Sequence, residues 1–389
     1  RASTLLFTPL QRASLTHPFM AVDLSSYGGL EPEHKARILK MSDISLETIT
    51  KRYTLGAELG RGRFSVVKSA IQKSDGGTYA VKVVENSSLS DEENLEALET
   101  EVAILRQLQH PHIVALKEVV TTDSDTYIVM ELLSGGELFN RIVDLGPFVE
   151  ATAADLFAQV CCAMEHLHSA QIVHRDIKPE NILYTEEGGT SVKVIDFGYA
   201  GVWSPEKPLT GLCGTPDYVA PEVLTWYDDE DRGKEYGKGS DVWSMGVLLY
   251  VILSGCSPFS ADEEEALLAQ VAEAKYEFYE NEWKSVSEDA KDLIRKMLVV
   301  DPEVRLSLEG VMSHPFLAEA VGRCRANLDD AAAAAADAKA EPPKAEAKAA
   351  TPKSGGRAAQ DAAADITLQP AEDDCAVQQV KPGSCCVIS

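Results

Sequence analysis

Apolar positions follow two different periods along the chain. Between residues 53 and 130 they alternate with polar ones in short runs, which predicts β-strands at residues 53–59, 65–71, 78–84, 113–120 and 126–130. In one stretch, residues 91–107, the spacing becomes helical. Beyond residue 132 the helical period dominates. The pattern therefore predicts an α+β protein with a small β-rich part, containing one helix, before a larger helical part.

The composition changes at both ends of this region. After residue 316 the chain continues as an Ala-rich tail, 317–389, in which residues 330–364 are dominated by Ala, Lys, Glu, Asp and Pro. We expect residues 328–384 to form a flexible tether with at most transient helix at the Ala run. Residues 1–52 form an N-terminal extension that we expect to be partly disordered. Its first twenty residues contain Arg, Ser and Thr without an acid, which is typical of a transit peptide, although Met20 could equally be a natural start.

Charge is concentrated in the middle of the chain. The 389 residues carry a formal net charge of −26, and residues 53–316 hold 46 Asp and Glu against 21 Lys and Arg. This balance argues against nucleic-acid binding through phosphate neutralisation and favours a cationic partner. The 8 Cys residues show no disulfide spacing, and no apolar run reaches the length of a membrane span. These features are typical of a protein of a reducing compartment.

The first two predicted strands are joined by a glycine-containing loop. Gly60 and Gly62 allow backbone amides to approach phosphate oxygens, although a hairpin turn would use the same residues. Lys82 follows in the third strand and Glu101 in the predicted helix. A lysine that is held toward phosphates needs a carboxylate partner, which the helix can supply. A dinucleotide-binding loop is disfavoured because the chain returns as a strand and not as a helix.

Three further motifs follow in order. They are His174-Arg175-Asp176-Ile177-Lys178-Pro179-Glu180-Asn181, then Asp196-Phe197-Gly198, then Ala220-Pro221-Glu222. Together with the glycine loop, Lys82 and Glu101, they resemble the eukaryotic protein kinases over residues 53–316. The resemblance implies a two-lobed fold with an N-lobe at 53–132 and a C-lobe at 133–316, and it implies ATP and Mg²⁺ as cofactors.

The resemblance also assigns roles. Asp176 is expected to accept the proton of the substrate hydroxyl, and Lys178 to neutralise the transferring phosphoryl group. Asn181 and Asp196 carry oxygen ligands suited to Mg²⁺. The ATP site is expected to include Leu59, Gly60, Gly62, Val67, Ala80, Lys82, Met130, Glu131, Leu133, Glu137, Asn181 and Asp196, with Glu101 as the partner of Lys82.

Other matches are structural. Leu105, Leu116, His174 and Phe197 correspond to the apolar column that aligns the lobes of active kinases. Asp241 resembles the helix residue that holds the catalytic loop. Arg305 resembles the late arginine that pairs with the glutamate of the Ala-Pro-Glu motif, here Glu222, so Arg305→Ala should lower the folded yield first.

The type of kinase follows from smaller features. Lys178 and the segment Gly214-Thr215-Pro216 resemble Ser/Thr kinases, with Thr215 bridging the catalytic loop. The segment 135–142 and the turn Ser257-Pro258-Phe259 resemble the calcium/calmodulin-dependent group, whereas the segment 212–216 also resembles the cyclic-nucleotide-dependent kinases. Both resemblances imply that Glu137 binds an arginine three residues before the target, with Glu180 as a second acid.

Several positions depart from the family pattern. Ser65 replaces the third loop glycine, and Val251 replaces a glutamate of a stronger arginine pocket. Gly211 occupies the usual activation-loop phosphosite, whose phosphate would pair with Arg175. Either the adjacent Thr210 is the switch, or the segment is ordered without a phosphate.

The tail supplies few basic residues. After the catalytic region only Arg323 and Arg325 could belong to a calmodulin-binding helix, and no calcium-binding loop is present. The pattern leaves calmodulin open as a partner without favouring it.

The motif Cys386-Val387-Ile388-Ser389 fits a C-a-a-X box and predicts farnesylation. A single prenyl chain binds membranes only marginally, so Cys385 is the expected palmitoylation site, and Cys375 is a weaker candidate. We therefore expect attachment to the cytoplasmic face of a membrane.

Two other functions compete with a protein kinase. A catalytically silent scaffold of the same fold is disfavoured because Lys82, Asp176, Asn181 and Asp196 are all present. A small-molecule phosphotransferase is disfavoured by the complete peptide-docking segment from Gly214 to Glu222.

Overall fold

The computed structural model describes residues 31–45, 49–62, 65–224 and 235–340. The chain divides into two compact units, which are described separately. The first unit comprises the chain up to Gly136 together with His166–Asp176 and Asn181–Leu209, and the second comprises Glu137–Glu165, Ile177–Glu180 and the chain from Thr210.

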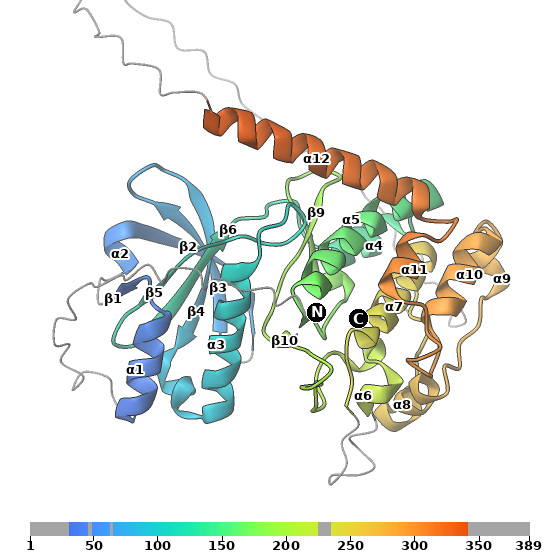
Figure 1. The fold of residues 1–389 in the computed structure, drawn as a ribbon, viewed down its shortest axis with the longest axis horizontal. Coiled ribbons are helices and arrows are strands. Elements are labelled where there is room, and N and C mark those ends of the chain that lie inside the picture. Colours follow the sequence, from blue (N-terminus) through green and yellow to red (C-terminus); the bar gives the residue numbers. More distant parts are fainter. Residues whose placement is uncertain (1–30, 46–48, 63–64, 225–234, 341–389) are drawn as a thin grey trace, which may run out of the picture. The chain divides into compact units, whose positions relative to one another are not determined.

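A six-stranded sheet forms the centre of the first unit (Figure 1), with the strand order β1-β5-β6-β4-β3-β2. Neighbouring strands are antiparallel, except that β1 pairs parallel with β5. The strands are β1 (Ile44–Ser45), β2 (Tyr53–Arg61), β3 (Ser65–Gln72), β4 (Thr78–Glu85), β5 (Leu116–Thr121) and β6 (Asp125–Glu131). All five predicted strands are therefore present, and β1 is an additional strand.

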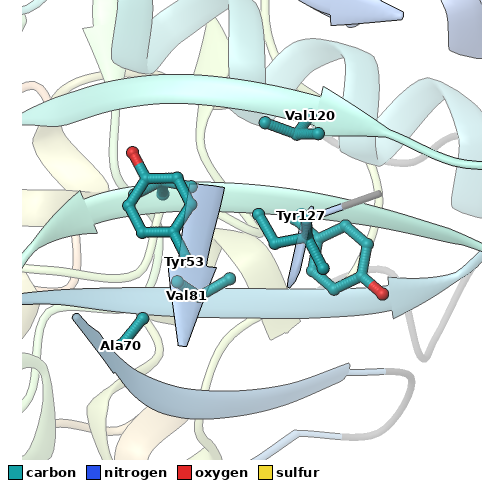
Figure 2. Close-up of a cluster of buried hydrophobic side chains, with 7 residues drawn as sticks. Tyr53, Ala70, Val81, Val120 and Tyr127 are labelled. Carbon is teal, nitrogen blue, oxygen red and sulfur yellow. The ribbon is translucent and has the colours of Figure 1, made fainter. Parts of the chain in front are cut away.

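One face of the sheet buries a compact apolar cluster (Figure 2). Its members come from alternating positions of the strands, and a short helix, α2 (Ile49–Arg52), adds one more residue. The cluster consists of Ile49, Tyr53, Ala70, Val81, Val120, Tyr127 and Val129. This is the period of two that predicted the strands, with every second side chain on the buried face.

Helix α3 (Glu92–Gln107) is the helix predicted at residues 91–107. It begins where Asp91 accepts hydrogen bonds from the backbone amides of Glu93 and Asn94, which satisfies two of the free N–H groups at a helix start. Its buried positions are Leu95, Leu98, Glu101, Val102, Ile104 and Leu105. Before it lie α1 (Pro32–Met41) and the short 3₁₀ helix η2 (Asn86–Ser90).

The rest of the first unit is built from short pairs of strands. Strand β7 (Ile172–Val173) pairs with β10 (Gly201–Val202), and β8 (Ile182–Tyr184) pairs with β9 (Val192–Val194). The 3₁₀ helix η3 (Pro179–Asn181), whose first two residues belong to the second unit, leads into β8.

The second unit is helical. Residues Ser240–Ser254 of α7 (Gly239–Ser254) are all buried, so this helix forms the centre of the unit. The other helices are α4 (Leu138–Leu145), α5 (Glu150–Ser169, whose last turn belongs to the first unit), η4 (Pro216–Tyr218), α6 (Pro221–Leu224), α8 (Glu264–Ala272), α9 (Glu280–Trp283), α10 (Glu288–Met297), α11 (Leu308–Met312) and α12 (Ala318–Ala340).

Helix α12 corrects one sequence prediction. A flexible tether was expected from residue 328, but residues 328–340 continue the helix. Its beginning is held to α5 by ion pairs from Arg323 to Asp155 and from Arg325 to Glu165, both at 2.6 Å. Alanine has the highest helix propensity, so the Ala run extends a helix that tertiary contacts have already nucleated.

Candidate active site

A buried ion pair joins the sheet to α3. The Lys82 ammonium on β4 donates to both carboxylate oxygens of Glu101, at 2.6 and 2.9 Å. Burial lowers the pKa of Lys82, but the Glu101 and Asp196 carboxylates outweigh it, so the net pKa is raised. Lys82 therefore stays charged, as a group that binds phosphates must.

The catalytic-loop motif also brings two predicted residues together. Asp176 and Asn181 are buried, and the Asn181 amide nitrogen donates to the Asp176 carbonyl at 2.8 Å and to its carboxylate at 2.9 Å. These bonds fix the carboxylate and determine the orientation of the amide. Because the amide nitrogen is committed to Asp176, the carbonyl oxygen of Asn181 is the atom that can bind a cation.

Asp196 follows the β8–β9 hairpin. Ile182 pairs with Val194 and the Ile195 amide donates to the Asn181 carbonyl, so Asn181 and Asp196 lie at the same end of the hairpin. Asp196 has φ +59°, and its carboxylate is 3.9 Å from the Lys82 ammonium. A non-glycine residue in this left-handed region is strained, which is common where a functional side chain must be aimed.

Two residues of the predicted apolar column, His174 and Phe197, are in direct contact. The rings of His174 and Phe197 meet edge to face with centroids 5.1 Å apart, and both side chains are fully buried. The His174 ring also forms a hydrogen bond with the Ile195 carbonyl at 3.1 Å, and its Nδ1 atom accepts a hydrogen bond from the Asp176 amide at 3.3 Å. Packing and loop positioning account for this histidine, as the sequence predicted.

The space around Gly60 in the glycine loop is open among the described residues. A Cβ atom added at Gly60 would meet no described atom within 4 Å, so packing within the described protein does not require glycine there. The Gly62 amide donates to the Ser65 carbonyl at 2.8 Å, which closes the turn between β2 and β3. Of the other predicted ATP contacts, Leu59 is exposed, whereas Val67, Ala80, Met130 and Leu133 are half-buried.

The donors suit magnesium better than a metal bound by protein alone. Among the described residues, no three His, Cys, Asp or Glu side chains are grouped so that they could hold a metal by themselves. Asn181 and Asp196 offer two oxygen donors, and the Asp196 side chain is about half exposed. Mg²⁺ commonly takes one or two protein oxygens and completes its shell with phosphates and water, so the residues fit the ATP–Mg²⁺ group.

Sequence reasoning missed the partner of the Glu131 side chain. Its carboxylate accepts from the Lys193 ammonium at 2.6 Å and from the Ala115 amide at 2.7 Å. The Glu131 amide donates to the Ala115 carbonyl at 3.1 Å, so the side chain and the amide of Glu131 both bind the backbone of Ala115. Lys193 lies 62 positions away, and no local pattern could have indicated this pair.

In the second unit, Lys178 and Thr215 meet as predicted. The Lys178 ammonium donates to the Thr215 hydroxyl at 2.7 Å. This bond ties the catalytic loop to the segment just before η4 and limits the conformations of a long lysine side chain.

Glu137 and Glu180 also lie together. Burial raises the pKa of Glu137, and the Glu180 carboxylate raises it further. The Oε2 atom of Glu180 is buried without a hydrogen-bond partner among the described residues. Leaving a buried carboxylate oxygen unpaired is costly, so this pair of acids favours a cationic ligand.

The activation segment is held by a residue that the sequence did not indicate. The Tyr236 hydroxyl bonds the Gly211 carbonyl at 2.9 Å and lies 3.6 Å from the Cys213 sulfur. The neighbouring Thr210 is exposed, and in the first unit the Arg175 guanidinium donates to the Tyr199 carbonyl.

The lipidation sites predicted at Cys385 and Cys386 lie outside the described residues. None of the helices in the described part of the chain combines the length and apolar composition needed to span a bilayer.

Comparisons with known proteins bear on this geometry. A family model described as "protein kinase domain" matches residues 53–317. A probable myosin light chain kinase from Dictyostelium discoideum is 42% identical over 264 residues, which cover 68% of this chain and 73% of the relative. Myosin light chain kinase A of the same organism is 42% identical over 270 residues, covering 69% of this chain and 89% of the relative. Calcium-dependent protein kinase 2 of Arabidopsis thaliana is 38% identical over 297 residues, which cover 74% of this chain and 45% of the relative.

Proposed function

The chain is a serine/threonine kinase of the protein kinase family, and we propose that it selects substrates with an arginine three residues before the phosphorylated residue. It uses ATP and Mg²⁺, which supply the phosphoryl group and neutralise its charge. The family membership and the retained Lys82, Asp176, Asn181 and Asp196 leave the silent scaffold without support.

We assign the catalytic roles from the geometry of the two units. Asp176, fixed by the Asn181 amide, accepts the proton of the substrate hydroxyl. Lys82, held extended by Glu101, binds the phosphates of ATP. Lys178, held by Thr215, offers positive charge to the transferring group. Asn181 and Asp196 supply oxygen ligands to the cation.

One observation carries the proposed specificity. Glu137 and Glu180 place two carboxylates together, with one oxygen buried and unpaired among the described residues. A guanidinium can donate to two carboxylates at once through its planar array of N–H groups, so arginine suits this pair better than lysine. The acidic surface of residues 53–316 attracts such substrates over longer distances.

The test compares matched peptides that differ only at the position three residues before the target, with Arg, Lys, Ala or Glu. We expect kcat/KM to be highest for Arg. The variants Glu137→Gln and Glu180→Gln should both reduce the advantage of Arg over Ala. Glu180 is not one of the predicted ATP-site residues, so Glu180→Gln should do this without lowering turnover of the Ala peptide. A kinase that prefers the Glu or Ala peptide would disprove the proposed specificity.

The activation segment gives two alternatives. Thr210 is exposed and can be phosphorylated, whereas Tyr236 already holds the adjacent Gly211 carbonyl. We propose that Tyr236 orders the segment without a phosphate. Thr210→Ala should then retain activity and Tyr236→Phe should reduce it, and the opposite result would identify Thr210 as the switch.

Calcium control is a separate question. Arg323 and Arg325 pair with Asp155 and Glu165 of α5, so a docked α12 does not offer them as a basic calmodulin-binding face. We therefore propose that peptide phosphorylation does not depend on calmodulin. Comparing the activity of the full chain with and without Ca²⁺ and calmodulin tests this, and strong activation would refute it.

We also propose that Cys386 is farnesylated and Cys385 palmitoylated, which would place the kinase at the cytoplasmic face of a membrane. The proposal of farnesylation is based on the sequence of the last four residues, in which a cysteine, two aliphatic residues and a serine form the recognition motif. Mass spectrometry of protein expressed in a eukaryotic cell should find both lipids. If Cys386→Ser leaves the protein in the membrane fraction, the anchor proposal fails.

A further inference from the structure

The segment before the sheet packs along α3, the helix that carries Glu101. Helix α1 lies against α3 (Figure 1), with Ile38 fully buried. Arg37 donates to both carboxylate oxygens of Glu99 at 3.0 and 2.7 Å, and to Glu92 at 2.5 Å. His34 bonds the same Glu92 at 2.9 Å. A bidentate arginine fixes distance and angle together, so these contacts set where the first half of α3 lies.

The far end of α3 is fixed to the same segment. Arg106 donates to the Met41 carbonyl at 2.5 Å and to the Asp43 carboxylate at 2.8 Å. Asp43 is in turn held to β5, since it accepts from the Val119 amide at 2.7 Å and its own amide donates to the Val119 carbonyl at 2.8 Å. Residues 32–45 thus hold α3 near both ends and connect it to the edge of the sheet through β1.

Glu101 lies between these two attachments. Arg37 binds Glu99, which is only two residues before Glu101. A shift of α3 relative to α1 that separates Glu101 from Lys82 would therefore also disturb the Arg37–Glu99 pair. From this geometry we propose that residues 32–45 are a positioning element that holds α3 where Glu101 meets Lys82, with Arg37 as its main positioning residue.

The proposal explains how α3 is placed in a chain with Gly211 at the usual phosphosite. Kinases need the Lys–Glu pair in place before transfer, and activation-loop phosphorylation commonly controls it. Here residues 32–45, which belong to the same chain, supply a constraint on α3 that needs no phosphorylation. The inference rests on kinase activity and on the predicted role of Lys82, and it is independent of the arginine preference proposed above.

The experiment compares full-length Arg37→Gln with Lys291→Gln. Lys291 makes an ion pair on α10 with Glu288 at 3.0 Å and is similarly shielded, so it controls for general loss of a surface pair. We expect Arg37→Gln to lower kcat/KM about fivefold, mainly through a higher KM for ATP, because the pair biases one helix position. Lys291→Gln should leave both constants unchanged, and Arg37→Lys should recover part of the loss.

Two further measurements separate positioning from stability. Hydrogen exchange of the α3 amides should accelerate in Arg37→Gln while the unfolding midpoint matches that of Lys291→Gln. In a Glu101→Gln background, Arg37→Gln should have no additional effect on nucleotide affinity, because its action passes through Glu101. An equal KM for ATP in Arg37→Gln and Lys291→Gln, or an undiminished effect in the Glu101→Gln background, would overturn the proposal. A missing arginine preference would leave these results unaffected.

Discussion

Arg305 offers the sharpest test of how the second unit is held together. Its guanidinium makes a bidentate pair with Glu222, at 2.7 and 2.8 Å, with side-chain exposures of 0% and 8%. It also donates to the carbonyls of Gly239 at 2.7 Å and Val299 at 2.9 Å, and it lies over the Trp243 ring at 5.2 Å. One side chain therefore joins α6, the start of α7 and the segment that follows α10.

The variant Arg305→Ala would remove the guanidinium that binds both oxygens of the buried Glu222 carboxylate. Breaking a buried ion pair from one side costs about 3–5 kcal/mol. For a domain of this size, where 1 kcal/mol moves the unfolding midpoint by roughly 2–4 °C, the midpoint should fall by roughly 6–20 °C. Thermal unfolding followed by circular dichroism measures this directly, and kcat per folded molecule should change much less.

The double variant Arg305→Met/Glu222→Leu separates the pair from the rest of the site. An apolar pair often replaces a buried ion pair at little cost. The double variant should therefore regain about half or more of the fall in unfolding midpoint that Arg305→Ala causes. If Arg305→Ala lowers the midpoint by no more than Lys291→Gln does, the pair contributes no more than a surface contact and this reasoning is wrong.

Three other predictions follow from the site and from α12. Burial and the Glu180 carboxylate raise the pKa of Glu137. Because arginine binding needs an ionised Glu137, the ratio of kcat/KM for the Arg peptide to that for the Ala peptide should fall as the pH decreases through that raised pKa. In a pH series, Glu180→Gln should move this fall to lower pH, and an unchanged profile would contradict the pairing. Lys82→Met should lower kcat about 10²–10³-fold, and Glu101→Gln should lower it by a smaller factor, because the lysine charge remains in the second variant. Equal losses of kcat in steady-state assays would argue against a positioning role for Glu101. Cys324 of α12 is buried, so placing a charge there with Cys324→Asp should release the helix and accelerate amide exchange over residues 318–334. Unchanged exchange would show that α12 is held by its ion pairs alone.

Much of the first unit could be predicted from local pattern. The strands and α3 follow from alternating and helical spacing, because one face of each element must be buried. Lys82 and Glu101 were expected to pair, and they do so at 2.6 Å. Such predictions succeed because the chemistry requires particular residue types at particular places along one short stretch.

The contacts that fix these elements were not predictable in the same way. Arg37 is one of 36 Lys and Arg residues, and nothing near it in the sequence indicates that its partner is Glu99. The same holds for Lys193 with Glu131 and for Tyr236 with Gly211. Many acids and carbonyls could serve as partners, and the choice depends on which of them the packed fold brings within hydrogen-bond distance.

The sequence by itself determined the protein family and the positions of α3 and of strands β2 to β6 along the chain, because motif spacing and hydrophobic period are local properties. Only the tertiary structure decided that residues 32–45 hold α3, that Tyr236 holds the activation segment and that α12 continues to residue 340. These features depend on contacts between segments far apart in the chain, whose free energy exists only once the chain has packed.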